Sequence, residues 1–280
     1  MKYLLVLVSG GRSSVKMARR IQIGRKYRKY KKLYVFCNTG QEKPETIDFL
    51  KDMVMFWKIP LYIIEGVYSD LPGIGVKHKI VDFNSMDMKS RVFSEMIKHL
   101  QKNKWTGVPN QATPYCSEYL KVRPSNSFAK QVFQTTKYIK AIGFRKEDMP
   151  KRISWAEIRI ETKRIFPLIT DFTNPVDQFH LNRWYKRRKF RLKLHSKLGN
   201  CRYCWKKDKL NLVEAIRIDI EKGDLETIEW YRNEENLYGN MFFRENLSID
   251  DLVKLASDPL RQLEFVFEDQ EDDFKCVCNF

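Results

Sequence analysis

The sequence predicts an α/β protein built on a twisted parallel sheet with helices on both faces. Three short apolar runs, at residues 3–8, 33–36 and 61–64, are continuous rather than alternating, as expected of strands that are buried on both sides. The segments between them repeat apolar residues at helical spacing. Strands that alternate with helices in this way pair in parallel, and ligands then bind at the carboxyl ends of the strands.

The first apolar run leads into a loop rich in glycine and serine, Ser9-Gly10-Gly11-Arg12-Ser13-Ser14. Apolar residues from Val15 to Ile21 then recur at helical spacing, so a helix is expected to start directly from the loop. The glycines permit a tight turn, and the helix N-terminus presents free N–H groups and a dipole to an anion. The pattern is a candidate phosphate-binding loop, and the alternative is an ordinary turn between a strand and a helix.

The remaining elements are expected from apolar spacing and from proline and glycine positions. In chain order they are a helix from Pro44 to Lys58, a loop over 66–84, a helix over 85–102, an interruption at Arg123-Pro124 before a helix to about Phe133, a strand over 138–143, a short extended segment over 164–169, a helix that follows Thr173-Asn174-Pro175 to about Arg188, and a helix that starts at Ser248. We divide the chain into a sheet-bearing part, residues 1–209, and an acidic, mainly helical part, residues 210–280.

Charge is unevenly distributed along the 280 residues. The net charge is +17, yet residues 221–280 hold 6 Lys and Arg against 16 Asp and Glu, whereas residues 1–220 hold 46 against 19. The strong excess of basic residues in 1–220 suits polyanionic partners, namely nucleotides, tRNA or DNA. Residues 183–209 interleave basic residues with aromatic ones such as Trp184 and Trp205, which is typical of surfaces that bind single strands or tRNA. The alternative is an amphipathic helix whose aromatic residues face the core.

The sequence also limits the cellular setting. No apolar run approaches the roughly 20 residues of a membrane span, and no secretory signal pattern is present, so we expect a cytoplasmic protein without membrane attachment. The 6 cysteines are then expected to be reduced, metal-bound or redox-active rather than paired in structural disulfides. Cys201 and Cys204 form a close pair that suits one metal ion or thiol–disulfide exchange.

Several motifs together resemble one family. The loop at residues 9–14 resembles the PP-loop of adenine-nucleotide α-hydrolases, and Phe36-Cys37-Asn38-Thr39-Gly40-Gln41-Glu42, with Pro44-Glu45-Thr46, resembles the second-strand signature of PAPS (phosphoadenosine phosphosulfate) reductases. Ile142-Gly143-Phe144-Arg145, followed by Arg152, is similar to the Gly-x-Arg segment of that branch. The segment from Gly199 to Lys207 resembles one seen in its bacterial and phage members. In this order, over residues 3–209, the motifs resemble the PAPS reductase family of the PP-loop ATP pyrophosphatase superfamily.

The resemblance implies a PP-loop (HUP-type) fold that binds an adenine nucleotide, either adenylyl sulfate (APS or PAPS) or ATP. The expected nucleotide-binding residues are Ser9, Gly10, Gly11, Arg12, Ser13, Ser14, Asn38, Thr39, Gly40, Gly143, Arg145 and Arg152. Lys121 and Arg145 are candidate catalytic cations, because ammonium and guanidinium groups suit sulfate and phosphate oxygens. Magnesium is a further candidate cofactor, although many ATP pyrophosphatases have Asp where this loop has Ser13.

The resemblance also concerns the cysteines. Relatives pair a residue in the position of Cys116 with the later Cys-x-x-Cys, which implies a metal site at Cys116, Cys201 and Cys204, for an iron–sulfur cluster ahead of zinc. Cys276 or Cys278 would complete this site or act as the nucleophile. Assimilatory PAPS reductases end in Glu-Cys-Gly-(Leu/Ile)-His, whose cysteine attacks the sulfonate sulfur, whereas this chain ends in Lys275-Cys276-Val277-Cys278-Asn279-Phe280.

Three functions therefore stay open. The first is a PAPS-reductase-like oxidoreductase that releases sulfite with a thioredoxin-like reductant. The second is an ATP-dependent enzyme that inserts sulfur into tRNA or DNA through a cysteine-bound iron–sulfur cluster. The third is a nucleotide-binding regulator without turnover, because the chain lacks both the loop Asp and the C-terminal motif.

Overall fold

A six-stranded, mostly parallel sheet organises the chain in the computed structural model, which describes residues 2–69, 71, 73–102, 107–195, 198–199 and 201–258. The strand order is β4-β3-β2-β1-β5-β6, and only β4 runs antiparallel to its neighbour among the described strands. The strands are β1 (Lys2–Leu7), β2 (Tyr30–Cys37), β3 (Leu61–Val67), β4 (Lys77–Val81), β5 (Ile139–Ala141) and β6 (Arg164–Ile165). The predicted α/β class with a largely parallel sheet is confirmed.

Strand β1 is apolar throughout because it is buried on both faces. It pairs in parallel with β2 on one side and β5 on the other, so that Leu5 lies between Leu33 and Lys140. Alternate side chains of β1 enter two separate hydrophobic clusters: Leu4 belongs to one and Leu5 to the other. A central parallel strand needs apolar residues at every position for this reason.

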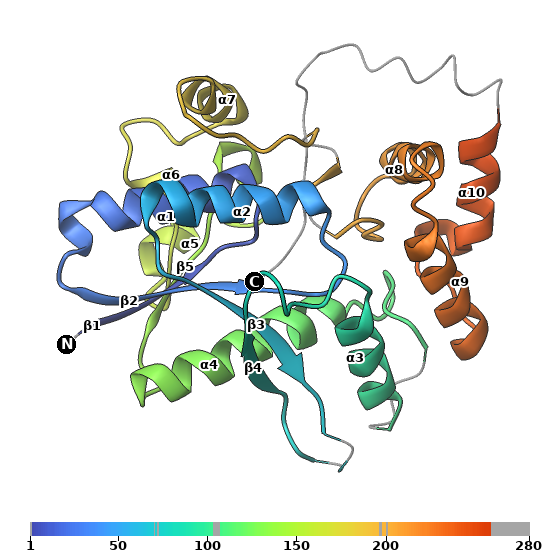
Figure 1. The fold of residues 1–280 in the computed structure, drawn as a ribbon. Helices are drawn as coiled ribbons and strands as arrows, with labels where there is room; N and C mark the ends of the chain where they lie inside the picture. The colour runs from blue at the N-terminus through green and yellow to red at the C-terminus, as the bar shows by residue number, and fades with distance from the viewer. Residues whose placement is uncertain are drawn as a thin grey trace.

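Helices cover both faces of the sheet (Figure 1). On one face lie α1 (Arg12–Ile23) and α2 (Pro44–Trp57), with α7 (Gln178–Lys186) beyond them, and on the other lies α4 (Arg123–Phe133). Pro44 occupies the first turn of α2, as predicted, where the missing N–H costs nothing. Two short helices, α5 (Trp155–Ile160) and α6 (Pro167–Thr170), flank β6 along the chain.

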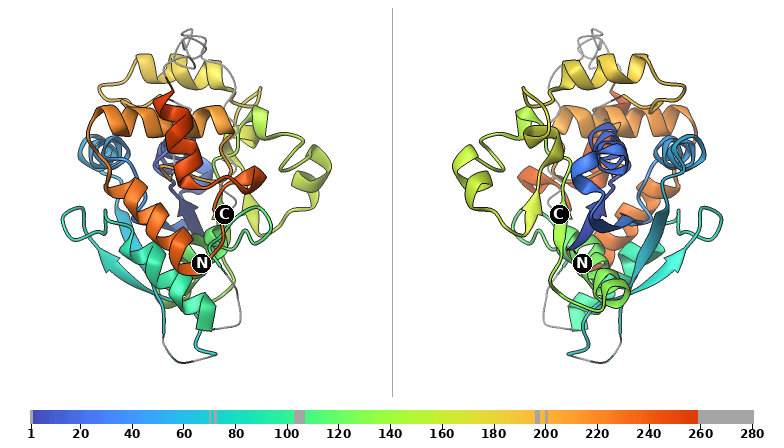
Figure 2. Two further views of the ribbon diagram at one scale, coloured as in Figure 1. Left: turned by 90° about the vertical axis from the view of Figure 1, so that its right-hand side faces the viewer. Right: turned by 90° about the vertical axis from the view of Figure 1, so that its left-hand side faces the viewer.

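The remaining helices gather at the carboxyl ends of the parallel strands (Figures 1 and 2). They are α3 (Arg91–Lys102), α8 (Lys209–Glu221), α9 (Glu226–Tyr238) and α10 (Ile249–Ser257). Ser248 caps α10 by accepting from the Asp251 N–H, which confirms the expected helix start. A buried ion pair between Lys43 Nζ and Asp219 Oδ1, at 2.7 Å, joins α8 to the loop after β2.

The sequence predictions fail at five boundaries. The extended segment expected over 164–169 ends at Ile165, and Pro167–Thr170 form helix α6 instead. Residues 66–84 contain strand β4 rather than loop alone, and the helix expected over 85–102 starts only at Arg91. Asp177, not residues 173–175, caps α7, since its carboxylate accepts the His180 N–H at 2.7 Å. Pro124 does not interrupt the chain: a turn of π-helix at Glu118–Val122 continues into α4, where the proline lies in the first turn.

None of the helices in the described part of the chain is long and apolar enough to span a membrane.

The buried Lys43–Asp219 pair should contribute far more to stability than an exposed pair. Both side chains are almost fully buried, so Lys43→Met leaves a buried carboxylate without its ammonium partner and should lower the free energy of unfolding by about 3–5 kcal/mol. Lys51→Met, which removes an exposed partner of Asp48, is the control and should cost less than about 1 kcal/mol. Urea unfolding measures both values, and equal losses would contradict the assignment.

Candidate nucleotide and thiol site

The loop after β1 forms a tight turn against the start of α2. Gly10 has a positive φ of 78°, and a Cβ at this position would lie 2.4 Å from Thr46 Cγ2, so only glycine fits. Ser14 Oγ accepts hydrogen bonds from the Ser9 N–H (3.0 Å) and the Ser9 hydroxyl (3.1 Å), and it donates to the Gly11 carbonyl. Helix α1 starts without a side-chain cap and without an acidic residue in its first turn. Its positive dipole end is therefore not neutralised by an acidic residue of its own first turn.

This loop lies where the strand order reverses. From β1 the chain moves through β2 and β3 on one side, and it later returns to β5 on the other. A Cβ on Gly143, just after β5, would lie 3.0 Å from Ser14 Cα and 3.1 Å from Ser14 N, so the two loops are in close backbone contact. In open α/β sheets ligands bind at the carboxyl edge at such a reversal.

The three predicted arginines all have protein partners. Arg12 donates to Asn182 Oδ1 at 2.6 Å and is thus directed toward α7. Arg145 donates to Gln178 Oε1 and lies 3.8 Å from Glu147 Oε2. Arg152 pairs with Asp148 at 3.0 Å, and its guanidinium lies over the Phe144 ring. An incoming phosphate or sulfate would compete with these contacts.

The predicted segment Asn38–Gly40 is fully buried and braces the carboxyl end of β2. Asn38 Nδ2 donates to Glu65 Oε1 and to the Asp87 carbonyl, both at 2.7 Å. Gly40 has a φ of 78°, and a Cβ there would lie 2.4 Å from Asp87 Oδ2. Both residues thus hold the loops that surround the sheet edge.

Thr39 connects this segment to the cysteines. Its hydroxyl donates to Glu42 Oε1 at 2.8 Å and lies 3.7 Å from Cys201 Sγ. Glu42 is buried, and burial raises the pKa of its carboxyl, while the nearby Lys121 ammonium opposes this effect. Glu42 belongs to the second-strand signature quoted from the sequence, but it was not predicted as a site residue, because a single Glu after a strand carries no pattern that assigns it a role.

Cys116, Cys201 and Cys204 line one small cavity of about 30 Å³, together with Lys121 and Lys206. The buried Tyr231 lies close enough to all three for each thiol to add to the rise in its pKa, whose main cause is burial. Within the described residues, no three Cys, His, Asp or Glu side chains are arranged tightly enough to hold a metal ion. The structure therefore gathers the predicted trio around one cavity without setting the thiols at single-ion distances.

Trp205 lies in the wall of the cavity, and Cys37 lies behind it, hydrogen-bonded to a residue of the wall. The buried Trp205 indole N–H has no hydrogen-bond partner among the described residues. Cys37 is fully buried and donates to the Lys121 carbonyl, and burial raises the pKa of its thiol to about 12. Cys37 is thus an inert packing residue. Cys276 and Cys278 lie outside the described residues.

The aromatic residues of the stretch 183–209 are packing residues, which corrects their reading as a nucleic-acid surface. Tyr185, Phe190, Tyr203 and Trp205 are buried, and the half-buried Trp184 contacts the ring of Trp57. They cannot stack on bases while they hold the helices together. The alternative reading, in which these residues face the core, is the correct one.

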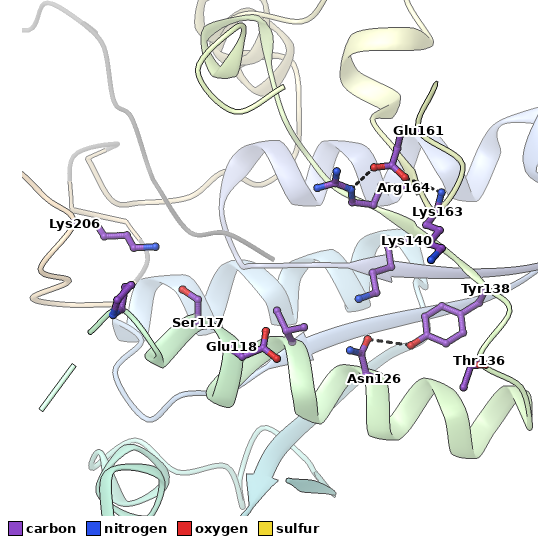
Figure 3. A pocket seen from close by; sticks show the side chains of 12 residues that line it. Ser117, Glu118, Asn126, Thr136, Tyr138, Lys140, Glu161, Lys163, Arg164 and Lys206 are labelled. Carbon is purple, nitrogen blue, oxygen red and sulfur yellow. Dashed lines mark hydrogen bonds and ion pairs between the residues drawn. The ribbon is translucent and has the colours of Figure 1, made fainter. Parts of the chain in front are cut away.

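A larger groove of about 750 Å³ opens beside the cavity, between the start of α4 and strands β5 and β6 (Figure 3). Ser117 and Lys206 line both the groove and the thiol cavity. Lys140, Lys163 and Arg164 lie along its far side.

The chain is similar to the uncharacterized nin region protein ORF290 of Escherichia phage lambda. The two are 28% identical over 241 residues, which span 80% of this chain and 75% of the phage protein. No protein-family model matches the sequence. No solved structure matches it either. Because the phage protein is itself described as uncharacterized, the similarity carries no activity to this chain.

Lys16, on α1 just after the loop, should make stability depend on pH. Its side chain lies against the rings of Phe172 and Trp184, and burial lowers its pKa to about 8 from an ordinary 10.5. Between these values the unfolded chain binds the proton more strongly than the folded one, so stability rises with pH. The unfolding free energy of the wild type, relative to Lys16→Met, should increase by on the order of 1–3 kcal/mol between about pH 7 and pH 10.

Urea unfolding at the two pH values measures this difference. The matched control is Lys51→Met, which removes an exposed lysine and should show no such trend. A difference between wild type and Lys16→Met that stays flat across this window would contradict the lowered pKa.

Proposed function

We propose that the chain is an adenine-nucleotide-binding enzyme that carries out reductive or transfer chemistry at sulfur, similar to PAPS reductases. The observation that supports it best is the convergence of Cys116, Cys201 and Cys204 on one cavity beside Thr39, at the carboxyl edge of the sheet. Thiols concentrated at a ligand-binding edge suit attack on sulfur, electron transfer or sulfur delivery.

The nucleotide would place its phosphates on the loop Ser9–Ser14. The uncapped start of α1 supplies N–H groups and the positive end of a dipole. The close contact of Gly143 with Ser14 keeps the neighbouring loop near enough to form a second wall. Arg145, at the end of that second loop, would exchange its contact with Gln178 for a phosphate or sulfate oxygen.

The three thiols also suit a metal group. Thiolates favour zinc and iron–sulfur clusters, and the unpartnered Trp205 N–H beside the cavity suits an acceptor such as a sulfide or thiolate. A cluster spaces its ligands more widely than a single ion does, so a cluster asks less of the separation between the three thiols than a zinc ion would. In such a site Cys116, Cys201 and Cys204 would bind the group, which would supply electrons or sulfur.

A second candidate is ATP-dependent insertion of sulfur into tRNA or DNA. It is favoured by the position of Lys206, which lines both the thiol cavity and the neighbouring open groove and would give a large substrate a route to the thiols. The two candidates differ in their products. The first yields sulfite from adenylyl sulfate and thioredoxin, and the second yields pyrophosphate from ATP only with nucleic acid present.

Anaerobic purification tests the thiol site. We expect the wild type to carry iron with a brown absorption band, or zinc without colour, and we expect Cys201→Ser to lose most of the metal. Cys37→Ala, which alters a buried cysteine outside the cavity, should retain it. Metal analysis and an absorption spectrum of all three proteins give the readout, and equal metal content in the two variants would contradict the assignment.

Calorimetry with ATP and with adenylyl sulfate tests the nucleotide loop. Ser13→Ala removes a half-exposed hydroxyl from the loop and should weaken binding about threefold to tenfold, the usual effect of one lost hydrogen bond. Ser257→Ala, an exposed serine on α10, should bind as the wild type does. Absence of binding by the wild type to both nucleotides would overturn the proposed function.

A further inference from the structure

The groove of about 750 Å³ exists because α4 covers only part of its face of the sheet. The α4 residue Phe128 packs on Tyr62 of β3 and His78 of β4, and the helix contacts β2, β3 and β4. Strands β5 and β6 are not among these main contacts, and the sheet surface there lines the groove (Figure 3). Glu118, Val122 and Asn126, four residues apart, form the helical wall of the groove.

The open strand surface carries cations where a covered strand would carry apolar residues. Lys140 pairs with Leu5 and lies on the face whose other members, including Ile142, join a hydrophobic cluster. It is half-buried, and burial lowers the pKa of its ammonium. Burial of this ammonium costs free energy, which the Glu118 carboxylate offsets in part and a bound anion would offset further.

The carboxylates of the groove offset its cations only in part: Glu118 favours the charged form of Lys140, but its ion pair is with Arg123. Glu161 is engaged by Arg164 at 2.6 Å, and Glu118 pairs with Arg123 at 3.2 Å. The ammonium groups of Lys140, Lys163 and Lys206 form no ion pair with any described residue. The three lie at separate points along the groove, with Lys206 at one end and Lys163 near the other (Figure 3).

An aromatic ring lies in the same wall. Tyr138 lines the groove as a half-buried ring that packs on Phe133, and its hydroxyl donates to Asn126 Oδ1 at 3.0 Å, which fixes the ring beside the cations. Spaced cations that follow a phosphate backbone, with an aromatic ring for a base, are the features by which proteins bind single strands. A groove of this volume is of the size that encloses a drug-sized ligand and is far too small for a duplex.

We infer that this groove binds a short stretch of unpaired nucleic acid, with phosphates on Lys140, Lys163 and Lys206 and a base against Tyr138. Because Ser117 and Lys206 also line the thiol cavity, a strand in the groove ends beside the cysteines. The inference goes beyond the proposed function: it rests on the charges and shape of the groove, and it holds whether or not the thiols act on sulfur.

Fluorescence anisotropy of the full-length protein with a labelled oligothymidylate of about 12 nucleotides tests the groove. The wild type should bind with an affinity that falls steeply as salt increases. The triple variant Lys140→Gln, Lys163→Gln, Lys206→Gln should bind at least about tenfold more weakly, and the slope of log affinity against log salt should decrease by about 2, the value for three lost phosphate contacts.

The control removes the same charge elsewhere. Arg25→Gln, Lys29→Gln, Lys31→Gln alters exposed residues around the start of β2, and it should change the affinity less than twofold. If the two triple variants lost affinity for the oligonucleotide equally, the loss would be due to net charge alone, and the inference would be overturned. Absent binding by the wild type, equal binding of a duplex, or equal competition by polyglutamate would overturn it as well. No nucleotide or reductant is added, so failure here leaves the calorimetry and metal measurements able to succeed.

Discussion

The buried carboxylate of Asp219 determines how the two parts of the chain fit together. It pairs with Lys43 from the loop after β2, accepts the Tyr203 hydroxyl at 2.8 Å, and lies 4.0 Å from Arg202. A buried charge must be satisfied, so these groups hold one another in fixed positions. Because Tyr203 and Arg202 lie between Cys201 and Cys204, the same carboxylate sets where those thiols lie against the sheet edge.

The carboxyl edge of the sheet is therefore both the place where the C-terminal helices are held to the sheet and the location of the candidate site. Buried polar residues after β2 and β3 satisfy one another, as in the bonds of Asn38 to Glu65 and of Thr39 to Glu42. Such networks are costly when incomplete and rigid when complete. The thiol cavity thus adjoins a rigid network, because the Thr39 hydroxyl lies 3.7 Å from Cys201 Sγ.

Local patterns predicted the sheet well and its environment poorly. Continuous apolar runs gave β1, β2 and β3, and Pro44 gave the start of α2, because these signals are contained in a few neighbouring residues. Strand β4 was missed because its sequence, Lys-His-Lys-Ile-Val, depends on pairing with β3 rather than on its own burial. The groove could not be predicted from the sequence either, because it depends on which strands α4 covers in the folded chain. For the cysteine trio, the family resemblance gave the grouping, whereas spacing gave only the pair Cys201 and Cys204.

The composition of the thiol cavity determines when it can form during synthesis of the chain. Cys116 leaves the ribosome long before Cys201 and Cys204, and before the Tyr231 side chain around which the three gather. A site that depends on contacts between such distant segments forms late in folding. Until residues 201–231 are made, Cys116 is an isolated thiol on an incomplete chain, so the thiol cavity is complete only once the C-terminal helices have packed.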